Sequence, residues 1–317
     1  MRLNELDDFR YPRRRPWLLL VVVPLVAFFV WHRFFRKPGE DKPDEDVVTT
    51  VVENDEAAGH DTGPATVENT PIAATADVTS LMSQARGMEA RDKLLEARDR
   101  YLAVLDRGAG GRARHEAEAA LGRINVALIV TERPTPDKID VIVKSGDSLE
   151  RIARRHGTTI DLIQKANQVT NPNRIRAGDH LRVFTGTFAI TASKLRNDMV
   201  VTMNGKFFKR YGVGSGRHGK TPVGLFTITE KIKEPVWWRP DGKEIPFGHE
   251  ENILGTRWMT LRAQEGTPDV RGYGVHGTWD EASIGKAESA GCLRMRNRDV
   301  EELFLYLPTR TPVTIVE

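Results

Sequence analysis

The sequence predicts a multidomain α+β protein that begins with a membrane-anchor helix and a disordered linker. A helical hairpin, a small βααβ module and a mainly-β C-terminal domain follow. Three observations predict this order: an uninterrupted apolar run near the N-terminus, a strongly acidic stretch after it, and a later change from helical periodicity to short β-rich runs separated by turn residues. A chain of 317 residues is long enough for two or more domains.

Residues 1–37 are expected to form a cytoplasmic tail and a single-pass transmembrane anchor. The stretch 17–31 is apolar throughout, and Arg13 to Arg15 precede it. It is slightly short for a bilayer, which snorkelling arginines would correct. No small-x-small site follows it, so a cleaved signal peptide is the weaker alternative. The basic cluster favours an inside N-terminus, which puts the rest of the chain on the periplasmic or cell-wall side of the cytoplasmic membrane.

Residues 38–78 are expected to form an acidic disordered linker. They contain one basic residue, Lys42, against eleven Asp and Glu. Such a segment buries too little apolar surface to order itself. Residues 79–317 then carry 38 basic and 30 acidic side chains, a net charge of +8, which favours weak attraction to anionic polymers. No stripe of clustered Lys and Arg with interleaved aromatics indicates nucleic-acid binding.

Residues 79–132 show helical periodicity in two runs, separated by Gly108-Ala109-Gly110-Gly111. Apolar residues recur at helical spacing: Leu81, Met88, Leu95 and Leu102 in the first run, and Ala117, Ala120, Leu121, Ile124 and Leu128 in the second. The pattern predicts a helical hairpin, which resembles a single tetratricopeptide-type unit. One such unit buries its apolar face poorly, so it would pack on the next domain or on a second copy. It is either a spacer or a partner-binding element.

Residues 138–185 are predicted to form a strand, two helices and a strand. Asp147 or Ser148 can cap the first helix, which ends at Gly157, and Thr159 can cap the second. The pattern V-K-S-G-D-S-L … I-R-A-G-D-H-L-R-V closely resembles a LysM domain.

The LysM resemblance implies binding of glycans that contain N-acetylglucosamine. The two loops that would hold the sugar offer Gly146, Asp147, Ser148 and the segment from Asn171 to Ile175. Many LysM sequences have an aromatic residue where this chain has Glu150, so binding would depend on hydrogen bonds and apolar groove walls. A purely structural spacer is the alternative.

Residues 187–317 are predicted to form the mainly-β domain. Asn204-Gly205 is the preferred pair for a tight hairpin turn, and Asp241-Gly242 suggests a second, projecting hairpin that carries Trp237 and Trp238. Asn297 is a candidate N-cap for a helix that ends before Pro308, and a last strand follows that helix.

Cys292 is the only cysteine of the chain, so it cannot close an internal disulfide. A lone cysteine is usually a small buried hydrophobe. Here, however, Gly291 precedes it, and His276 lies upstream in a glycine-flanked segment. A thiolate, a base and free backbone amides are the groups that covalent acyl transfer requires.

The pattern H-G-T … S-x-G-C-L-R-M resembles the signature of the L,D-transpeptidase (YkuD-type) family. Two further segments, Thr221-Pro222-Val223-Gly224-Leu225-Phe226 and Asn252-Ile253-Leu254-Gly255-Thr256-Arg257-Trp258, resemble family motifs in the family's order. Many members have histidine where this chain has Ala290. We expect that change to alter loop polarity more than chemistry.

The resemblance implies a catalytic set around Cys292. Cys292 would be the nucleophile, with His276 as base or as the partner of a thiolate–imidazolium pair. Arg294 would orient the thiolate or a substrate carboxylate, or it is only a structural ion pair, and Ser289 would hydrogen-bond within the loop. Gly291 and the Cys292 amide would be oxyanion donors, and the Gly277 carbonyl would orient the imidazole. Trp237, Trp238 and Thr278 would contact the substrate, with the alternative that the two tryptophans cover the sheet from one side.

The implied reaction is a two-step acyl transfer on peptidoglycan. The thiolate attacks the third residue of a tetrapeptide stem and expels D-alanine, and a diamino acid amine of a second stem then forms a 3→3 cross-link. Water or a protein lysine as acceptor would instead give an L,D-carboxypeptidase or protein attachment to the wall. An NlpC-type hydrolase places its Cys before its His, and a non-catalytic wall-binding scaffold would not need the pair. No metal motif and no sign of an organic cofactor is present.

Overall fold

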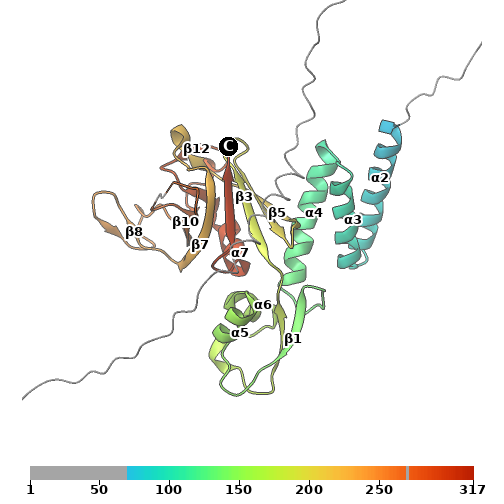
Figure 1. Ribbon diagram of the computed structural model, residues 1–317, viewed down its shortest axis with the longest axis horizontal. Helices are drawn as coiled ribbons and strands as arrows, with labels where there is room; N and C mark the ends of the chain where they lie inside the picture. The colour runs from blue at the N-terminus through green and yellow to red at the C-terminus, as the bar shows by residue number, and fades with distance from the viewer. Residues whose placement is uncertain (1–69, 269–270) are drawn as a thin grey trace, which may run out of the picture. The chain divides into compact units, whose positions relative to one another are not determined.

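The computed structural model describes residues 70–268 and 271–317, with side chains from residue 76 onwards (Figure 1). The chain divides into two units, Met1–Ala65 and Thr66–Glu317, and the described residues belong to the second. The predicted transmembrane anchor and most of the predicted linker lie outside the described residues. Within the described ranges, no helix is both long enough and apolar enough to cross a membrane.

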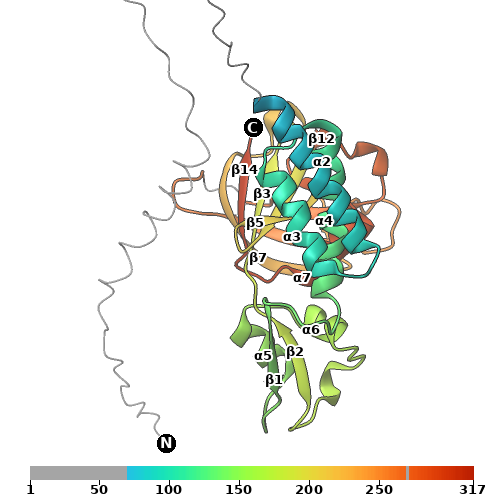
Figure 2. The ribbon, with the colours of Figure 1, turned by 90° about the vertical axis from the view of Figure 1, so that its right-hand side faces the viewer.

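The described part of the chain begins with three helices rather than the predicted hairpin. They are α2 (Thr70–Glu89), α3 (Leu94–Asp106) and α4 (Gly111–Ile129), and they lie side by side (Figures 1 and 2). The predicted second run is a single helix, α4. The predicted first run is divided into α2 and α3, so the hairpin prediction was wrong.

A tight turn at residues 90–93 divides the first run. Asp92 adopts a left-handed backbone (φ 59°), and the Lys93 N–H closes the turn on the Met88 carbonyl at 3.0 Å. This turn contains neither glycine nor proline, so the usual signal of a break was missing. Helix α2 also extends into the predicted linker, because residues 70–78 are helical.

Helix α4 packs against the edge strand β5 (Lys206–Gly212). Asn125 on α4 donates its side-chain amide to the Phe208 carbonyl at 2.9 Å. Glu118 on the same helix accepts two hydrogen bonds from the Arg210 guanidinium, at 2.8 and 3.0 Å. The helical region was expected to pack on the next domain or on a second copy. These contacts are instead with the C-terminal domain, which is not the next domain along the chain.

The predicted βααβ module is confirmed. It consists of β1 (Lys138–Ile142), α5 (Leu149–His156), α6 (Ile160–Ala166), the short 3₁₀ helix η1 (Pro172–Arg174) and β2 (His180–Phe184), with β1 antiparallel to β2 (Figure 2). Ser148 caps α5 by accepting the Arg151 N–H, and Thr159 caps α6 by accepting the Leu162 N–H. Gly157 ends α5 in the left-handed conformation (φ 65°).

An eight-stranded sheet forms the C-terminal domain, in the order β13-β11-β10-β7-β14-β3-β4-β5. Besides β5, its strands are β3 (Phe188–Ser193), β4 (Asp198–Met203), β7 (Gly224–Lys233), β10 (Arg257–Ala263), β11 (Gly274–Thr278), β13 (Leu293–Arg296) and β14 (Pro312–Val316). Gly214, just after β5, exchanges two backbone hydrogen bonds of 2.9 Å with Arg294 in β13. The two edges of the sheet are thereby tied together, and the sheet is nearly closed.

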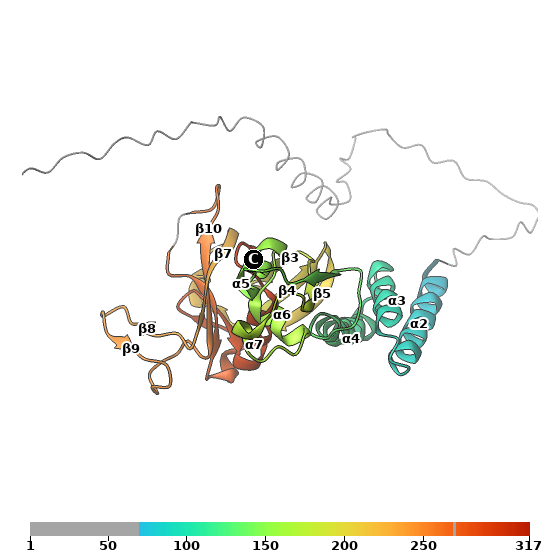
Figure 3. The ribbon, with the colours of Figure 1, turned by 90° about the horizontal axis from the view of Figure 1, so that it is seen from below.

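Two small strand pairs accompany the sheet. β6 (Ser215–Gly216) runs parallel to β12 (Ala287–Ser289), and the antiparallel pair β8 (Trp237–Trp238) and β9 (Glu244–Ile245) forms a projecting hairpin (Figure 3). The turn between β4 and β5 has Asn204 at φ 50° and Gly205 at φ 76°. Both predicted hairpins are therefore confirmed, and the first has the positive φ angles of a type I′ turn.

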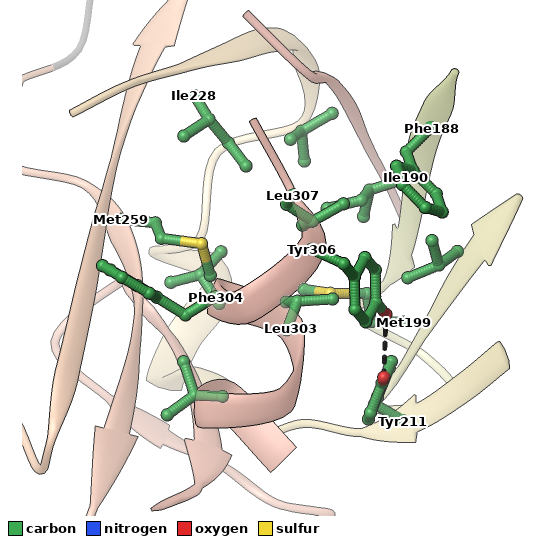
Figure 4. Close-up of a cluster of buried hydrophobic side chains, with 14 of the residues drawn as sticks. Phe188, Ile190, Met199, Tyr211, Ile228, Met259, Leu303, Phe304, Tyr306 and Leu307 are labelled. Carbon is green, nitrogen blue, oxygen red and sulfur yellow. Dashed lines mark hydrogen bonds between the residues drawn. The ribbon is translucent and has the colours of Figure 1, made fainter. Parts of the chain in front are cut away.

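Helix α7 (Asn297–Tyr306) fills the curve of the sheet. Leu303, Tyr306 and Leu307 pack against strand residues such as Ile190 and Ile228, and the Tyr306 hydroxyl lies 2.8 Å from that of Tyr211 (Figure 4). The helix ends before Pro308, as predicted.

Asn297 was predicted to be the N-cap of α7, but the helix begins at Asn297 itself and its N-cap is Arg296. The Asn297 side chain turns away from its own helix and accepts the Thr256 N–H at 3.1 Å.

We expect Glu118→Ala to lower the free energy of unfolding by about 2 kcal/mol, because Arg210 would lose a partner that is only 5% exposed. Glu116 is the matched control on the same helix, since its pair with Arg86 is exposed and Glu116→Ala should cost less than about 1 kcal/mol. Urea unfolding of the variants tests this prediction. Equal losses would contradict the inferred importance of the α4–β5 contact.

Candidate active site

A cavity of about 640 Å³ lies on the C-terminal domain and brings the predicted catalytic residues together. Cys292, His276, Arg294 and Ser289 all line it. The facing wall is apolar, and it includes Ile232, Val236, Trp237, Trp238, Ile253 and Trp258. The cavity therefore combines a thiol, an imidazole and a guanidinium with an apolar wall.

Two neighbouring strands position these groups. β11 and β13 are parallel, and their register places His276 directly opposite Arg294. Cys292 immediately precedes β13 and lines the same cavity, where its thiol donates to the Gly272 carbonyl oxygen at 3.6 Å. Cys292 and Arg294 lie 16 and 18 positions after His276 in the sequence. The pairing of β11 with β13 brings them to the same cavity.

The His276 ring is held by its own strand and by a tryptophan. Its Nδ1 lies 2.6 Å from the Gly277 carbonyl oxygen, and the Trp258 ring stacks on it with centroids 5.6 Å apart. A carbonyl oxygen can only accept, so Nδ1 carries the proton of the neutral ring and Nε2 is left as the basic nitrogen. The expected role of the Gly277 carbonyl in orienting the imidazole agrees with this geometry.

Burial lowers the pKa of His276 to about 4, against the opposing effect of the Gly277 carbonyl, and the nearby Arg294 charge lowers it further. Burial also raises the pKa of the Cys292 thiol, although the Gly274 backbone N–H and Arg294 partly offset this. At neutral pH the resting pair is therefore a neutral imidazole and a protonated thiol. Of the two protonation states expected, the thiolate–imidazolium pair is the disfavoured one.

Ser289 organises the loop that carries Cys292. Its Oγ accepts the Gly291 N–H at 3.0 Å and donates to the Cys292 carbonyl at 2.7 Å. The Gly291 N–H, which we expected to be an oxyanion donor, is therefore used within the loop. The Cys292 N–H remains as the candidate donor there.

Thr278 was expected to contact the substrate, but it does not face the cavity. It is 4% exposed and outside the cavity lining, and its hydroxyl accepts the Asp280 N–H at 3.1 Å. Trp237 and Trp238, in contrast, both line the cavity, and Trp238 is 65% exposed. Only the two tryptophans of this expected set are available to a substrate.

Asn252 holds the β8–β9 hairpin against the cavity, a role that the sequence reading missed. It is buried, and its amide donates to the carbonyls of Pro235 and Ile245, each at 3.0 Å. Its side-chain oxygen accepts the Leu254 N–H at 2.9 Å. The sequence feature that could have indicated this role is that Asn252 is the first residue of the N-x-L-G segment.

The residues expected to bind glycan are largely occupied within their own loops. Asp147 accepts the Lys144 N–H and pairs with Arg155, Ser148 caps α5, and Asn171 accepts the Asn173 N–H. Gly146 (φ 81°) presents its carbonyl to Arg151. Ile175 lines a separate cavity of about 430 Å³ on the module.

Within the described ranges, no group of three or more His, Cys, Asp or Glu is placed to hold a metal ion.

The chain matches two family models, one described as the L,D-transpeptidase catalytic domain over residues 187–315 and the other as the LysM domain over residues 141–184. YqjB of Bacillus subtilis is 38% identical over 129 residues, which cover 40% of this chain and 70% of YqjB. The chain belongs to the L,D-transpeptidase family. YkuD of the same organism is 31% identical over 180 residues, 55% of this chain and 96% of YkuD. Both relatives are named as L,D-transpeptidases.

These matches confirm both resemblances drawn from the sequence. In this L,D-transpeptidase family member, a LysM domain precedes the catalytic domain. YcfS of Escherichia coli, also named as an L,D-transpeptidase, is 27% identical over 205 residues, 57% of this chain and 62% of YcfS.

We expect the buried, neutral His276 to make the protein less stable in mild acid. The unfolded chain binds the proton near an ordinary pKa of about 6.5 and the native protein near 4, so the free energy of unfolding falls as the pH falls from 6.5 towards 4. Between pH 7 and pH 5 the wild-type protein should lose about 2 kcal/mol more than His276→Phe. Denaturant unfolding at the two pH values measures the difference, and equal losses in both proteins would contradict a buried neutral imidazole.

Proposed function

We propose that the protein is a membrane-anchored peptidoglycan L,D-transpeptidase that uses Cys292 as its nucleophile. The observation that carries this proposal is that His276 and Arg294, paired by strand register, line the same cavity as the only cysteine of the sequence. Membership of the L,D-transpeptidase family supports the substrate class.

The first step is acylation of the thiol. As Sγ attacks the carbonyl carbon of the third stem residue, Nε2 of His276 accepts the thiol proton, and a tetrahedral oxyanion forms. The Cys292 N–H is placed to stabilise that oxyanion. Collapse of the intermediate breaks the bond to the terminal D-alanine, whose amine takes the proton from the imidazolium as it leaves.

The second step returns the enzyme to its resting state. The diamino acid amine of a second stem attacks the thioester, His276 removes a proton from that amine, and the sulfur leaves and recovers the proton. The product is a 3→3 cross-link. The neutral resting pair suits this scheme because a basic Nε2 is free to accept the thiol proton when substrate arrives.

Arg294 is proposed to receive a carboxylate of the stem. Within the described part of the chain, its Nε is buried without a hydrogen-bond partner. Arg294 also lines the cavity, and a guanidinium is suited to bind a carboxylate. The apolar wall with Trp237 and Trp238 would contact the aliphatic parts of the stem.

Water or a protein lysine can replace the acceptor amine at the same acyl-enzyme. L,D-carboxypeptidase activity and protein attachment to the wall are therefore alternatives within the same mechanism. The LysM domain is proposed to hold the glycan strand. Because Asp147 and Asn171 already bond within their loops, backbone groups and the surroundings of Ile175 would contribute more than those side chains.

Mass spectrometry tests the acylation directly. We expect the protein, incubated with disaccharide-tetrapeptide, to gain a mass on Cys292 and to release 3→3 dimers, because the thioester is an obligatory intermediate of this mechanism. Cys292→Ala should show neither. Tripeptide without dimers would indicate carboxypeptidase action, and no adduct on a folded protein with a free thiol would favour a wall-binding scaffold.

Residues 1–37 are proposed to anchor the enzyme in the cytoplasmic membrane, with the catalytic part outside the cytoplasm. We expect the full chain, expressed in a bacterial host, to stay in the membrane pellet during alkaline carbonate extraction. This treatment releases proteins that are bound to the membrane surface by charge, but it does not release an inserted apolar helix. A chain that lacks residues 1–37 should be released. Release of the full chain would contradict the anchor.

A further inference from the structure

We propose that Thr221 is a positioning residue that orients the backbone N–H of Cys292 towards the oxyanion. The inference rests on the proposed acyl transfer and deepens it. Thr221 opens the T-P-V-G-L-F segment, and it lies 71 residues before the nucleophile in the chain. It does not line the cavity, so it would act through the loop rather than on the substrate.

The Thr221 hydroxyl connects two segments that meet at the nucleophile loop. It accepts the Gly216 N–H at 2.7 Å and donates to the Gly291 carbonyl at 2.8 Å, and the side chain is only 1% exposed. Gly216 ends β6, which is paired in parallel with β12 just before the loop. A single buried hydroxyl thus links β6 to the peptide bond that precedes Cys292.

That peptide bond decides where the Cys292 N–H points. In a trans peptide the C=O and the following N–H point in opposite directions within one plane. When Thr221 holds the Gly291 carbonyl, the Cys292 N–H must point away from Thr221. Ser289 meanwhile occupies the Gly291 N–H, so the inference assigns the oxyanion to the Cys292 N–H, the amide next to the attacking sulfur.

The surrounding packing allows little adjustment of this arrangement. A Cβ on Gly216 would lie 2.8 Å from the Gly291 Cα, and a Cβ on Gly291 (φ 143°) would lie 2.5 Å from the Tyr273 ring. These distances are below any normal contact, so both positions need glycine. The backbone segments are close enough for one hydroxyl to bridge them, and a variant without it leaves the Gly291 carbonyl buried and unpaired.

Comparing two reactions of the Cys292 thiol tests whether Thr221 positions the oxyanion donor or only stabilises the fold. Alkylation by iodoacetamide forms no oxyanion, whereas acylation by a nitrophenyl ester does. We expect Thr221→Val to slow single-turnover acylation about 10- to 100-fold while alkylation changes less than about threefold, since losing an oxyanion donor affects only the first reaction. Thr221→Ser, which keeps the hydroxyl, should restore acylation.

Thr311→Val is the matched control. Thr311 is also buried, and its hydroxyl donates to the Pro308 carbonyl at 2.7 Å, away from the cavity. This variant should lose comparable stability and acylate at the wild-type rate. Thermal unfolding of all variants confirms that each is folded at the assay temperature.

Three outcomes would overturn the inference: wild-type acylation in Thr221→Val, an equal loss of alkylation and acylation, or no rescue by Thr221→Ser. The nitrophenyl ester keeps this test independent of the natural substrate. Failure of the wild-type protein to react with disaccharide-tetrapeptide, with normal ester acylation, would count against the proposed function and leave the role of Thr221 intact.

Discussion

The parallel pairing of β11 and β13 is the constraint on which the rest of the site depends. It places His276 opposite Arg294 and delivers Cys292 at the start of β13. The pairing is itself secured from the far edge of the sheet, because Gly214 exchanges two hydrogen bonds with Arg294. A shift of one residue in this register would send Arg294 to the opposite face. Closure of the sheet and assembly of the catalytic groups are therefore one structural event.

Burial then determines the chemistry available to the assembled groups. The imidazole is enclosed by Trp258 and its own strand, so both its charged form and the thiolate are disfavoured at rest. In the proposed acylation, proton transfer from sulfur to Nε2 would therefore accompany formation of the bond between sulfur and the carbonyl carbon.

Local signals in the sequence predicted local features well. The Asn204-Gly205 turn, the Ser148 and Thr159 caps and the Cys–His pair each depend on residue types whose conformational or chemical preference acts within a few positions. The division between α2 and α3 was missed because Asp92 supplies the turn without glycine or proline. The occupied Gly291 N–H, the clamp by Asn252 and the bridge by Thr221 depend on tertiary contacts. No single sequence shows which backbone group a side chain will meet.

Those tertiary contacts share one feature. Thr221, Asn252 and Ser289 each direct their polar atoms to backbone groups rather than into the cavity. Each belongs to a segment that resembles a family motif, so the motifs encode a rigid frame of backbone around a small reactive set. The change from histidine to Ala290 fits this reading. Ala290 lines the cavity without a polar atom on its side chain, while its neighbours Ser289 and Gly291 keep the loop in place. The reactive geometry can therefore persist while the cavity wall changes in polarity, and the wall is where substrate preference within one mechanism would be set.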